Sequence, residues 1–195
     1  MKILIATSNP GKKKEYFEFL KDLKLEILSL ADLDIKESFK EKGRTFEENA
    51  FLKAYYAYTL TGFTTIGEDS GLLVPYLDFL PGIYSRRFSE SGKDEDNRRL
   101  LLDMLKGVPF EKRRAKFVCV SYLFLNEKEF YKFKDEVEGF ITYEERGKSG
   151  FGYDPIFLYP PLGRTFAEMD IKKKNEVSHR GKVLRELKNF LQKIL

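Results

Sequence analysis

Two adjacent carboxylates, Glu68 and Asp69, are the residues of this sequence with the clearest capacity for chemistry. They lie between the apolar run 63–66 and a glycine turn at Gly71. Neighbouring like charges are unfavourable unless a cation shares them, and hard oxygen ligands suit magnesium held together with substrate phosphates. Glu41 lies in a loop that could reach the pair, although solvent exposure explains it more simply. A solvated acidic turn stays open as the alternative, because short motifs often match by chance.

The segment that follows the first apolar run has the composition of an anion-binding turn. A helix that begins there offers free N–H groups and a partial positive charge, a lysine adds a full charge, and hydroxyl or amide groups add neutral donors. The alternative is an ordinary capped turn from strand to helix, because the spacing differs from that of the usual phosphate-binding loop. The segment comprises Thr7, Ser8, Asn9, Pro10, Gly11 and Lys12.

A glycine-rich stretch at residues 147–155 could hold a ring-shaped ligand. Glycines let the backbone approach a ligand closely, and an aromatic side chain on such a loop can stack on a base. Asp154 could accept hydrogen bonds from ring N–H groups, while backbone N–H groups address an exocyclic oxygen. The structural alternative is a surface loop that its own aromatic residues, Phe151 and Tyr153, stabilise.

Basic residues gather at two further places. Arg86 and Arg87 follow a Pro-Gly turn and could clamp a phosphate through bidentate hydrogen bonds. His179, the single histidine, lies beside Arg180 and after the lysine run 172–174. Cationic neighbours lower the pKa of a histidine, so a neutral hydrogen-bonding role is the more natural one. Solvated surface and a structural histidine are the alternatives.

The spacing of apolar residues predicts the elements that position these groups. Short apolar runs between turn residues indicate buried strands, and apolar residues three or four apart indicate helices. A strand, a helix and a second strand in succession predict an α/β protein with some parallel strands. A hairpin inserted into such a chain suggests two lobes with a cleft between them. The predicted strands are 2–6, 25–28, 63–66, 115–125 and 129–141, with a further short strand in the loop 151–159. The predicted helices open at Pro10, follow a capping box at Thr45 and Glu48, or span 94–105 and 182–195.

Composition limits the class of protein. A chain of 195 residues suits one domain, or one domain of two lobes, and 42% hydrophobic with 15% aromatic residues is not a disordered composition. Its net charge of +4, from 35 basic and 31 acidic residues, favours an anionic ligand without requiring nucleic acid. No apolar stretch is long enough to span a bilayer. The single cysteine, Cys119, lies in an apolar run, which predicts a buried thiol and is compatible with a reducing cytosol.

Six segments, taken together, closely resemble the Ham1/RdgB-like family, the inosine triphosphate pyrophosphatases, which are also called XTP/dITP diphosphatases. They occur in the family's order and cover nearly the whole chain, so the set is far more specific than any one motif. The segments are 7–12 (TSNPGK), 46–50 with 53–54 (FEENA and KA), 68–72 (EDSGL), 81–86 (PGIYSR), 151–157 (FGYDPIF) and 178–181 (SHRG).

The resemblance implies a fold and an activity. The fold is α/β, an elongated two-lobed mixed β-sheet flanked by helices with a central cleft, formed by residues 1–195 as a single domain. The activity is hydrolysis of non-standard purine nucleoside triphosphates (ITP, dITP and XTP) to the monophosphate and pyrophosphate, with Mg²⁺. The implied protein is a cytoplasmic homodimer that cleans the nucleotide pool, with no membrane or nucleic-acid partner.

Carried over residue by residue, the resemblance also implies roles for the site. Asp69 is the general base for the attacking water and a neighbour of the magnesium ion, and Glu41 and Glu68 are further metal ligands. Ser70 touches the substrate. The triphosphate is bound by Thr7 to Lys12; the base is held by Phe151, Gly152, Tyr153 and Asp154, with Phe151 stacking; and Lys174, His179 and Arg180 complete the recognition of base and phosphate.

One residue departs from the family pattern, which usually has aspartate at the position of Glu68. The charge is kept but the side chain is one methylene longer, so the departure bears on metal geometry rather than on the reaction class. Two other functions stay open. One is a house-cleaning pyrophosphatase for modified pyrimidine triphosphates, and the other is a protein that binds RNA or nucleotides without catalysis, against which the modest net charge and the acidic pair argue.

Overall fold

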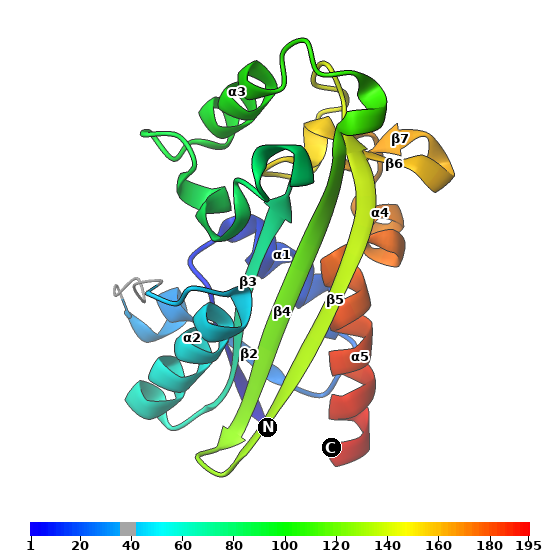
Figure 1. The fold of residues 1–195 in the computed structure, drawn as a ribbon. Helices are drawn as coiled ribbons and strands as arrows, with labels where there is room; N and C mark the ends of the chain where they lie inside the picture. Colours follow the sequence, from blue (N-terminus) through cyan, green and yellow to red (C-terminus); the bar gives the residue numbers. More distant parts are fainter. Residues whose placement is uncertain (36–41) are drawn as a thin grey trace. The chain divides into compact units, whose positions relative to one another are not determined.

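The computed structural model describes residues 1–35 and 42–195, and its strands form one mixed sheet of seven in the order β2-β1-β3-β4-β5-β6-β7 (Figure 1). The predicted α/β class is confirmed by this sheet and by the helices that flank it. The strands are β1 (Lys2–Ala6), β2 (Glu26–Ser29), β3 (Thr64–Leu73), β4 (Arg114–Asn126), β5 (Glu129–Ile141), β6 (Phe157–Tyr159) and β7 (Arg164–Thr165). The α-helices are α1 (Pro10–Leu20), α2 (Phe46–Thr61), α3 (Asp94–Met104), α4 (Ile171–Val177) and α5 (His179–Ile194).

The chain divides into two compact units. The first unit contains Met1–Asp69, Cys119–Asp135 and Lys182–Leu195, and the second contains Ser70–Val118 and Glu136–Gly181. Because the chain passes between the units within β3, β4, β5 and α5, each unit is built from segments that are distant in the sequence.

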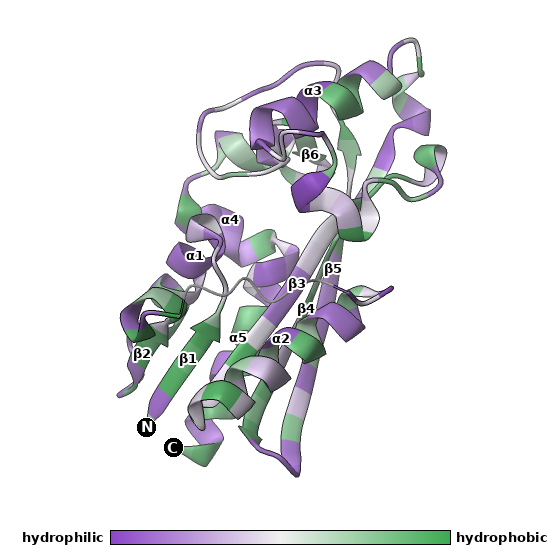
Figure 2. Ribbon diagram, turned by 90° about the vertical axis from the view of Figure 1, so that its left-hand side faces the viewer, coloured by the Kyte–Doolittle hydropathy of each residue, from purple (hydrophilic) through white to green (hydrophobic). Residues whose placement is uncertain are grey.

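In the first unit, β1 pairs in parallel with both β2 and β3, as a strand–helix–strand start predicts. Alternate residues of β1 enter different cores, which explains its unbroken apolar sequence (Figure 2). Ile3 and Ile5 pack with side chains of α1 and α5, while Leu4 packs on the other side with Ala57 of α2.

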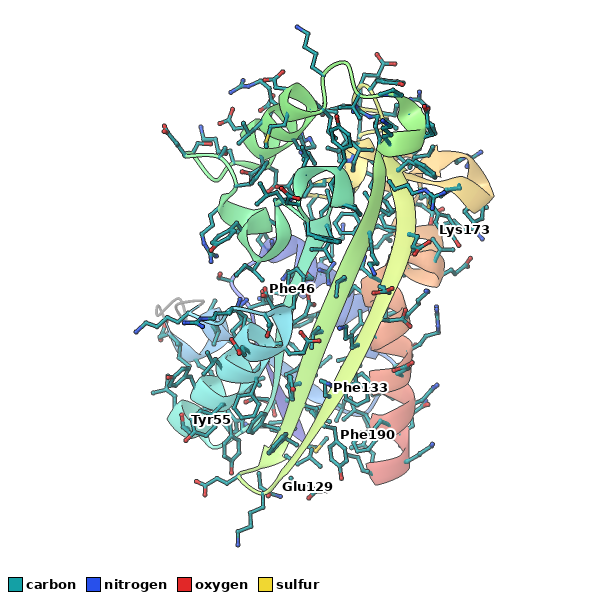
Figure 3. The ribbon with its side chains drawn as sticks, viewed as in Figure 1. Phe46, Tyr55, Glu129, Phe133, Lys173 and Phe190 are labelled. Carbon is teal, nitrogen blue, oxygen red and sulfur yellow. The ribbon has the colours of Figure 1, made fainter. Side chains whose placement is uncertain are left out.

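The β4–β5 hairpin packs against α5 through aromatic side chains. The rings of Phe133 on β5 and Phe190 on α5 point toward one another, with centroids 5.8 Å apart (Figure 3). Cys119 is fully buried in the same core, as its apolar neighbours predict. The core of the first unit therefore joins all three of its chain segments.

The second unit has a separate aromatic core. Phe117, Phe157 and Phe166 lie in contact, with ring centroids between 4.6 and 6.0 Å apart. At its edge, Arg113 is 1% exposed and donates hydrogen bonds to the backbone carbonyls of Leu105, Ile141 and Thr142 at 2.6 to 2.8 Å. Burial lowers the pKa of the Arg113 guanidinium.

Besides β7, a two-residue strand that was not predicted, three elements differ from the prediction. Strand β3 continues to Leu73, although the glycine after the acidic pair favoured a turn. Helix α5 begins at His179 rather than at residue 182, because the Ser178 hydroxyl accepts a hydrogen bond from the Gly181 N–H and caps the helix. Helix α4, capped by Asp170, was not predicted, since its seven residues are too few for a clear apolar period.

Candidate active site

The turn between β1 and α1 is tightly organised around Asn9. Its side-chain oxygen caps the helix by accepting hydrogen bonds from the N–H groups of Gly11 at 2.9 Å and Lys12 at 3.1 Å. The N–H of Asn9 in turn donates to the Thr7 hydroxyl at 3.2 Å. The predicted segment from Thr7 to Lys12, with Ser8 between the two polar residues, therefore forms one rigid strand-to-helix turn that directs the Lys12 side chain.

Lys12 forms an ion pair with Glu68. The ammonium nitrogen lies 3.2 Å from the carboxylate, whose side chain is 2% exposed. A buried carboxylate is stable only with such a partner, because removal of an unpaired charge from water is costly. The structure thus brings together two of the predicted site residues, one from the anion-binding turn and one from the acidic pair.

Asp69 has different partners, which belong to α2. Its side-chain oxygens accept a hydrogen bond from the Asn49 amide at 3.0 Å and contact the Lys53 ammonium at 3.3 Å. Lys53 also donates to the backbone carbonyl of Glu68 at 3.2 Å. Asn49 is itself oriented by the Gly43 N–H, which donates to its carbonyl oxygen at 2.8 Å. Asp69 is therefore held in one position by an amide and a cation.

Glu68 and Asp69 leave opposite faces of β3, because consecutive residues of a strand alternate. Glu68 meets α1 and Asp69 meets α2. The alternative of a solvated acidic turn is wrong, because both carboxylates are buried and the segment is a strand. A cation shared by the two carboxylates stays a prediction. The two carboxylates have separate environments and can have separate roles.

Gly67 makes the approach of α2 possible. A Cβ atom at this position would lie 2.6 Å from the carbonyl oxygen of Ala50 and 2.8 Å from the Cα of Ala54, closer than real side chains approach. Ala50 and Ala54 are fully buried against the strand. A glycine facing two alanines therefore lets the helix lie close enough for Asn49 and Lys53 to reach Asp69.

Asn49 and Lys53 were not predicted as site residues. The signal was present, because two polar residues four apart fall on the same helix face as Ala50, Ala54 and Ala57, which are buried. Two polar residues on a buried, apolar helix face are unusual and therefore indicate candidate site residues. Thr45 caps α2 as predicted, by accepting a hydrogen bond from the Glu48 N–H.

The carboxylates are suitable in donor type for a hard divalent cation. Both are buried, at 3% and 4% exposure, and both contact an ammonium group, so these positions already accommodate positive charge. Within residues 1–35 and 42–195, no group of three or more His, Cys, Asp or Glu side chains is arranged to hold a metal ion. Glu41, the third predicted ligand, lies outside the described residues.

A second group of charged residues, in the second unit, surrounds Phe151. The Lys174 ammonium lies 4.6 Å and the Arg180 guanidinium 5.4 Å from the centre of the Phe151 ring, which places both within cation–π range. Lys174 also forms a buried ion pair with Asp154 at 2.6 Å. Arg180 donates to the Ser70 hydroxyl at 2.9 Å. A chain of contacts thus connects five predicted residues.

His179 and Tyr153 are buried in the same unit. The His179 ring stacks flat on Phe117, with centroids 4.6 Å apart and planes 7° apart. The Tyr153 hydroxyl donates to the backbone carbonyl of Ser85 at 2.9 Å, and burial raises the pKa of that hydroxyl. Both residues are therefore buried next in sequence to members of the group around Phe151, His179 beside Arg180 and Tyr153 beside Asp154.

The arginines after the Pro-Gly turn contact protein groups. Arg86 lies 3.7 Å from the Asp94 carboxylate, and the Arg87 guanidinium lies over the Tyr84 ring at 5.3 Å. The Ser85 hydroxyl of this segment accepts from the Leu72 N–H at 3.0 Å, which fixes the segment to β3. Among the described residues, no helix is both long and apolar enough to cross a bilayer.

An open mixed sheet flanked by helices, with buried carboxylates that contact lysines, defines the chain as an α/β protein. The comparisons with known proteins are more specific. The chain belongs to the Ham1 family, whose model matches residues 3–190.

Named relatives cover the whole chain. A protein of Thermoanaerobacter sp. (strain X514), named dITP/XTP pyrophosphatase, is 45% identical over 196 residues, which cover 100% of this chain and 98% of the relative. A HAM1 protein structure from Coxiella burnetii is 36% identical with a TM-score of 0.89, covering 99% of both chains. The Staphylococcus aureus Ham1 protein is 37% identical with a TM-score of 0.87, covering 100% of both chains.

Proposed function

We propose that this chain hydrolyses the non-standard purine nucleoside triphosphates ITP, dITP and XTP to the nucleoside monophosphate and pyrophosphate. The observation that carries the proposal is the buried pair of Asp69 and Lys53, in a chain similar over its full length to proteins named dITP/XTP pyrophosphatase. The pair supplies a proton acceptor and a positive charge side by side. Hydrolysis of a phosphoanhydride needs both.

The proposed step is a single displacement by water. Asp69 accepts a proton from the water, whose oxygen forms a bond to the α-phosphorus while the bond from that phosphorus to the bridging oxygen breaks. The bridging oxygen leaves with the β- and γ-phosphates as pyrophosphate. Lys53 and Lys12, together with the N–H groups at the start of α1, would offset the negative charge of the leaving group. No side chain is required as a nucleophile.

We propose Mg²⁺ as the metal, with Asp69 and Glu41 as its ligands and Glu68 as a third carboxylate that keeps Lys12 in place. When bound, the ion would neutralise phosphate charge and lower the pKa of a coordinated water. The residues of this chain would position the triphosphate through the turn from Thr7 to Lys12. They would also hold the Asp69 carboxylate in place, through the Asn49 amide and the Lys53 ammonium.

We propose that the group around Phe151 selects the base. Phe151 would stack on the purine, and Ser70 would contact the substrate beside it. Donors from Lys174, Arg180 and the backbone of the 150–154 loop would meet the 6-keto oxygen of hypoxanthine or xanthine. The amino group of adenine presents hydrogens there, so these donors would stay unpaired and ATP would bind poorly. His179 would support this arrangement from its stacked position on Phe117.

The test is pyrophosphate release from a panel of nucleoside triphosphates, with and without Mg²⁺. We expect ITP, dITP and XTP to be turned over much faster than ATP, GTP or modified pyrimidine triphosphates. Asp69→Asn should lower kcat by about 10³-fold, because general bases contribute roughly 10²–10⁴. Asp103→Asn, on the exposed face of α3, is the matched control. Equal turnover of ATP and ITP, or full activity of the Asp69 variant, would contradict the proposal.

We also propose that the chain acts as one two-lobed domain within a cytoplasmic homodimer. Large apolar side chains that lie exposed on α2 and the adjoining hairpin support this, since contiguous exposed apolar patches mark interaction sites. Tyr55, Tyr56 and Leu60 are 40%, 49% and 56% exposed, and Phe130 is 44% exposed. Sedimentation should give twice the chain mass. Tyr56→Glu should halve that mass, whereas Tyr84→Glu, at a side chain 50% exposed in the other unit, should not.

A further inference from the structure

Two side chains of helix α3 form hydrogen bonds with the backbone of Gly152, one with its N–H and one with its carbonyl. The Asp94 carboxylate accepts a hydrogen bond from the Gly152 N–H at 2.8 Å, and the Arg98 guanidinium donates to the Gly152 carbonyl at 2.9 Å. Asp94 and Arg98 are four residues apart, so they project from the same face of the helix. Both polar groups of one glycine are therefore bound by two oppositely charged side chains.

Arg98 and Asp94 are themselves held by further charged partners. A second nitrogen of Arg98 donates to the Glu145 carboxylate at 2.7 Å, and the Arg98 side chain is only 13% exposed. The other carboxylate oxygen of Asp94 lies 3.7 Å from Arg86. Charged hydrogen bonds to backbone groups are stronger than neutral ones, and partial burial limits their screening. The two side chains therefore have little freedom to release Gly152.

Packing does not fix the conformation of Gly152. Its φ is +58°, in the left-handed region, and a Cβ atom placed there would meet nothing within 4 Å. Glycine enters and leaves this region at little cost. The hydrogen bonds from α3 therefore hold a backbone conformation that no neighbouring side chain enforces.

The direction of Phe151 depends on that conformation, because the two residues share a peptide bond. The Phe151 N–H donates to the Asp154 carboxylate at 2.9 Å, and the ring lies beside the cations of Lys174 and Arg180. A rotation at Gly152 would change the path of the chain between Phe151 and Asp154. The residues proposed to face the base would then lose their relative positions.

We propose that Asp94 and Arg98 are positioning residues for purine recognition: by clamping both backbone groups of Gly152, they preorganise the loop that presents Phe151 and Asp154 to the base. The inference rests on the proposed function and adds two residues to it. Loss of the clamp lowers the fraction of molecules with a binding-competent loop, and the apparent Kd rises by the same factor. A competent fraction of about one tenth gives a tenfold weaker Kd.

The experiment measures the affinity of the full chain for IMP and, separately, for pyrophosphate by calorimetry. Arg98→Ala and Asp94→Ala should each weaken IMP binding about tenfold and leave pyrophosphate binding unchanged, because the proposed phosphate-binding residues contact neither. Asp94→Asn keeps an oxygen acceptor for the Gly152 N–H and should bind IMP nearly as the native chain does. Arg99→Ala is the control, since that arginine is 71% exposed and contacts Asp96 instead.

Hydrogen exchange supplies a second readout on the same proteins. In Arg98→Ala and Asp94→Ala, the amides of residues 151–154 should exchange faster, with those of the first unit unaffected. The clamp is refuted if IMP affinity is unchanged, or if IMP and pyrophosphate weaken together. If the native chain binds no IMP and releases no pyrophosphate from dITP, the proposed function itself fails. If the native chain is active and both Arg98→Ala and Asp94→Ala bind IMP as tightly as Arg99→Ala does, the clamp is refuted and the proposed function stands.

Discussion

Substitution of Gly67 by alanine tests whether the close approach of α2 to β3 controls the chemistry. The new Cβ would lie 2.6 Å from the Ala50 carbonyl oxygen and closer still to the Ala54 nitrogen, whereas ordinary contacts begin at 3.4 Å, so the helix backbone must retreat by at least about 0.8 Å. Asn49 and Lys53 are carried by that helix. Their contacts with Asp69, now 3.0 and 3.3 Å, would lengthen to at least about 3.8 and 4.1 Å, which exceeds hydrogen-bond range.

The expected result is a loss of kcat of about a hundredfold, because displacement of catalytic groups by about 1 Å has that effect. Overpacking should also lower the free energy of unfolding by about 1–3 kcal/mol. The assays are pyrophosphate release from dITP at saturating substrate and chemical denaturation. A protein that stays folded under the assay conditions allows the two effects to be measured separately.

Gly139→Ala is the matched control for stability. Its Cβ would lie 2.6 Å from a ring atom of Phe157 and closer still to the Leu158 carbonyl oxygen. These residues belong to the second unit, whereas Asp69 belongs to the first. We expect a similar loss of stability with kcat within about threefold of native, since overpacking alone acts on folding. Native kcat in Gly67→Ala, or an equal loss of kcat in both variants, would refute the reasoning.

Three further predictions concern single side chains. Lys53→Met should lower kcat about a hundredfold by removing the cation beside Asp69, whereas Lys14→Met, exposed on α1, should leave it unchanged in the same assay. Phe151→Leu should raise the KM for dITP by about tenfold through lost stacking, with pyrophosphate inhibition unaffected; an equal weakening of pyrophosphate would contradict the assignment. Arg113→Met should lower the free energy of unfolding by about 3 kcal/mol, because three buried carbonyls lose their donors, while Arg114→Met at an exposed position should be neutral by denaturation.

Much of the fold was accessible from the sequence because its signals are local. Strand β1, the Asn9 and Thr45 caps and the long hairpin are each determined by residues within a few positions of one another. The end of β3 could not be predicted from the sequence, because Gly71 favours a turn locally and only pairing within the sheet extends the strand. Tertiary pairing overrode local preference at that point.

The candidate site, like the fold, was predicted only in part from the sequence. Motif resemblance predicted Glu68, Lys12 and the group around Phe151, and the structure pairs Lys12 with Glu68 in the first unit and places Lys174 against Asp154 and Phe151 in the second. Resemblance did not show that Glu68 and Asp69 have different partners, because that follows from strand alternation once the strand is known to continue. The resemblance also did not show the hydrogen bonds between α3 and Gly152, because Asp94 and Gly152 are more than fifty positions apart in the sequence.

The first turn of α5 contains His179 and Arg180 and no acidic residue. A positive side chain at the amino end of a helix opposes the helix dipole, by about 0.3–1 kcal/mol. Arg180 is 2% exposed, and its contacts with the Ser70 hydroxyl and the Phe151 ring offset that cost. An acidic replacement would suit the helix dipole but would leave a buried carboxylate without a partner, so it should lower the melting temperature. The burial of this position therefore makes the arginine necessary for the fold as well as for the proposed recognition.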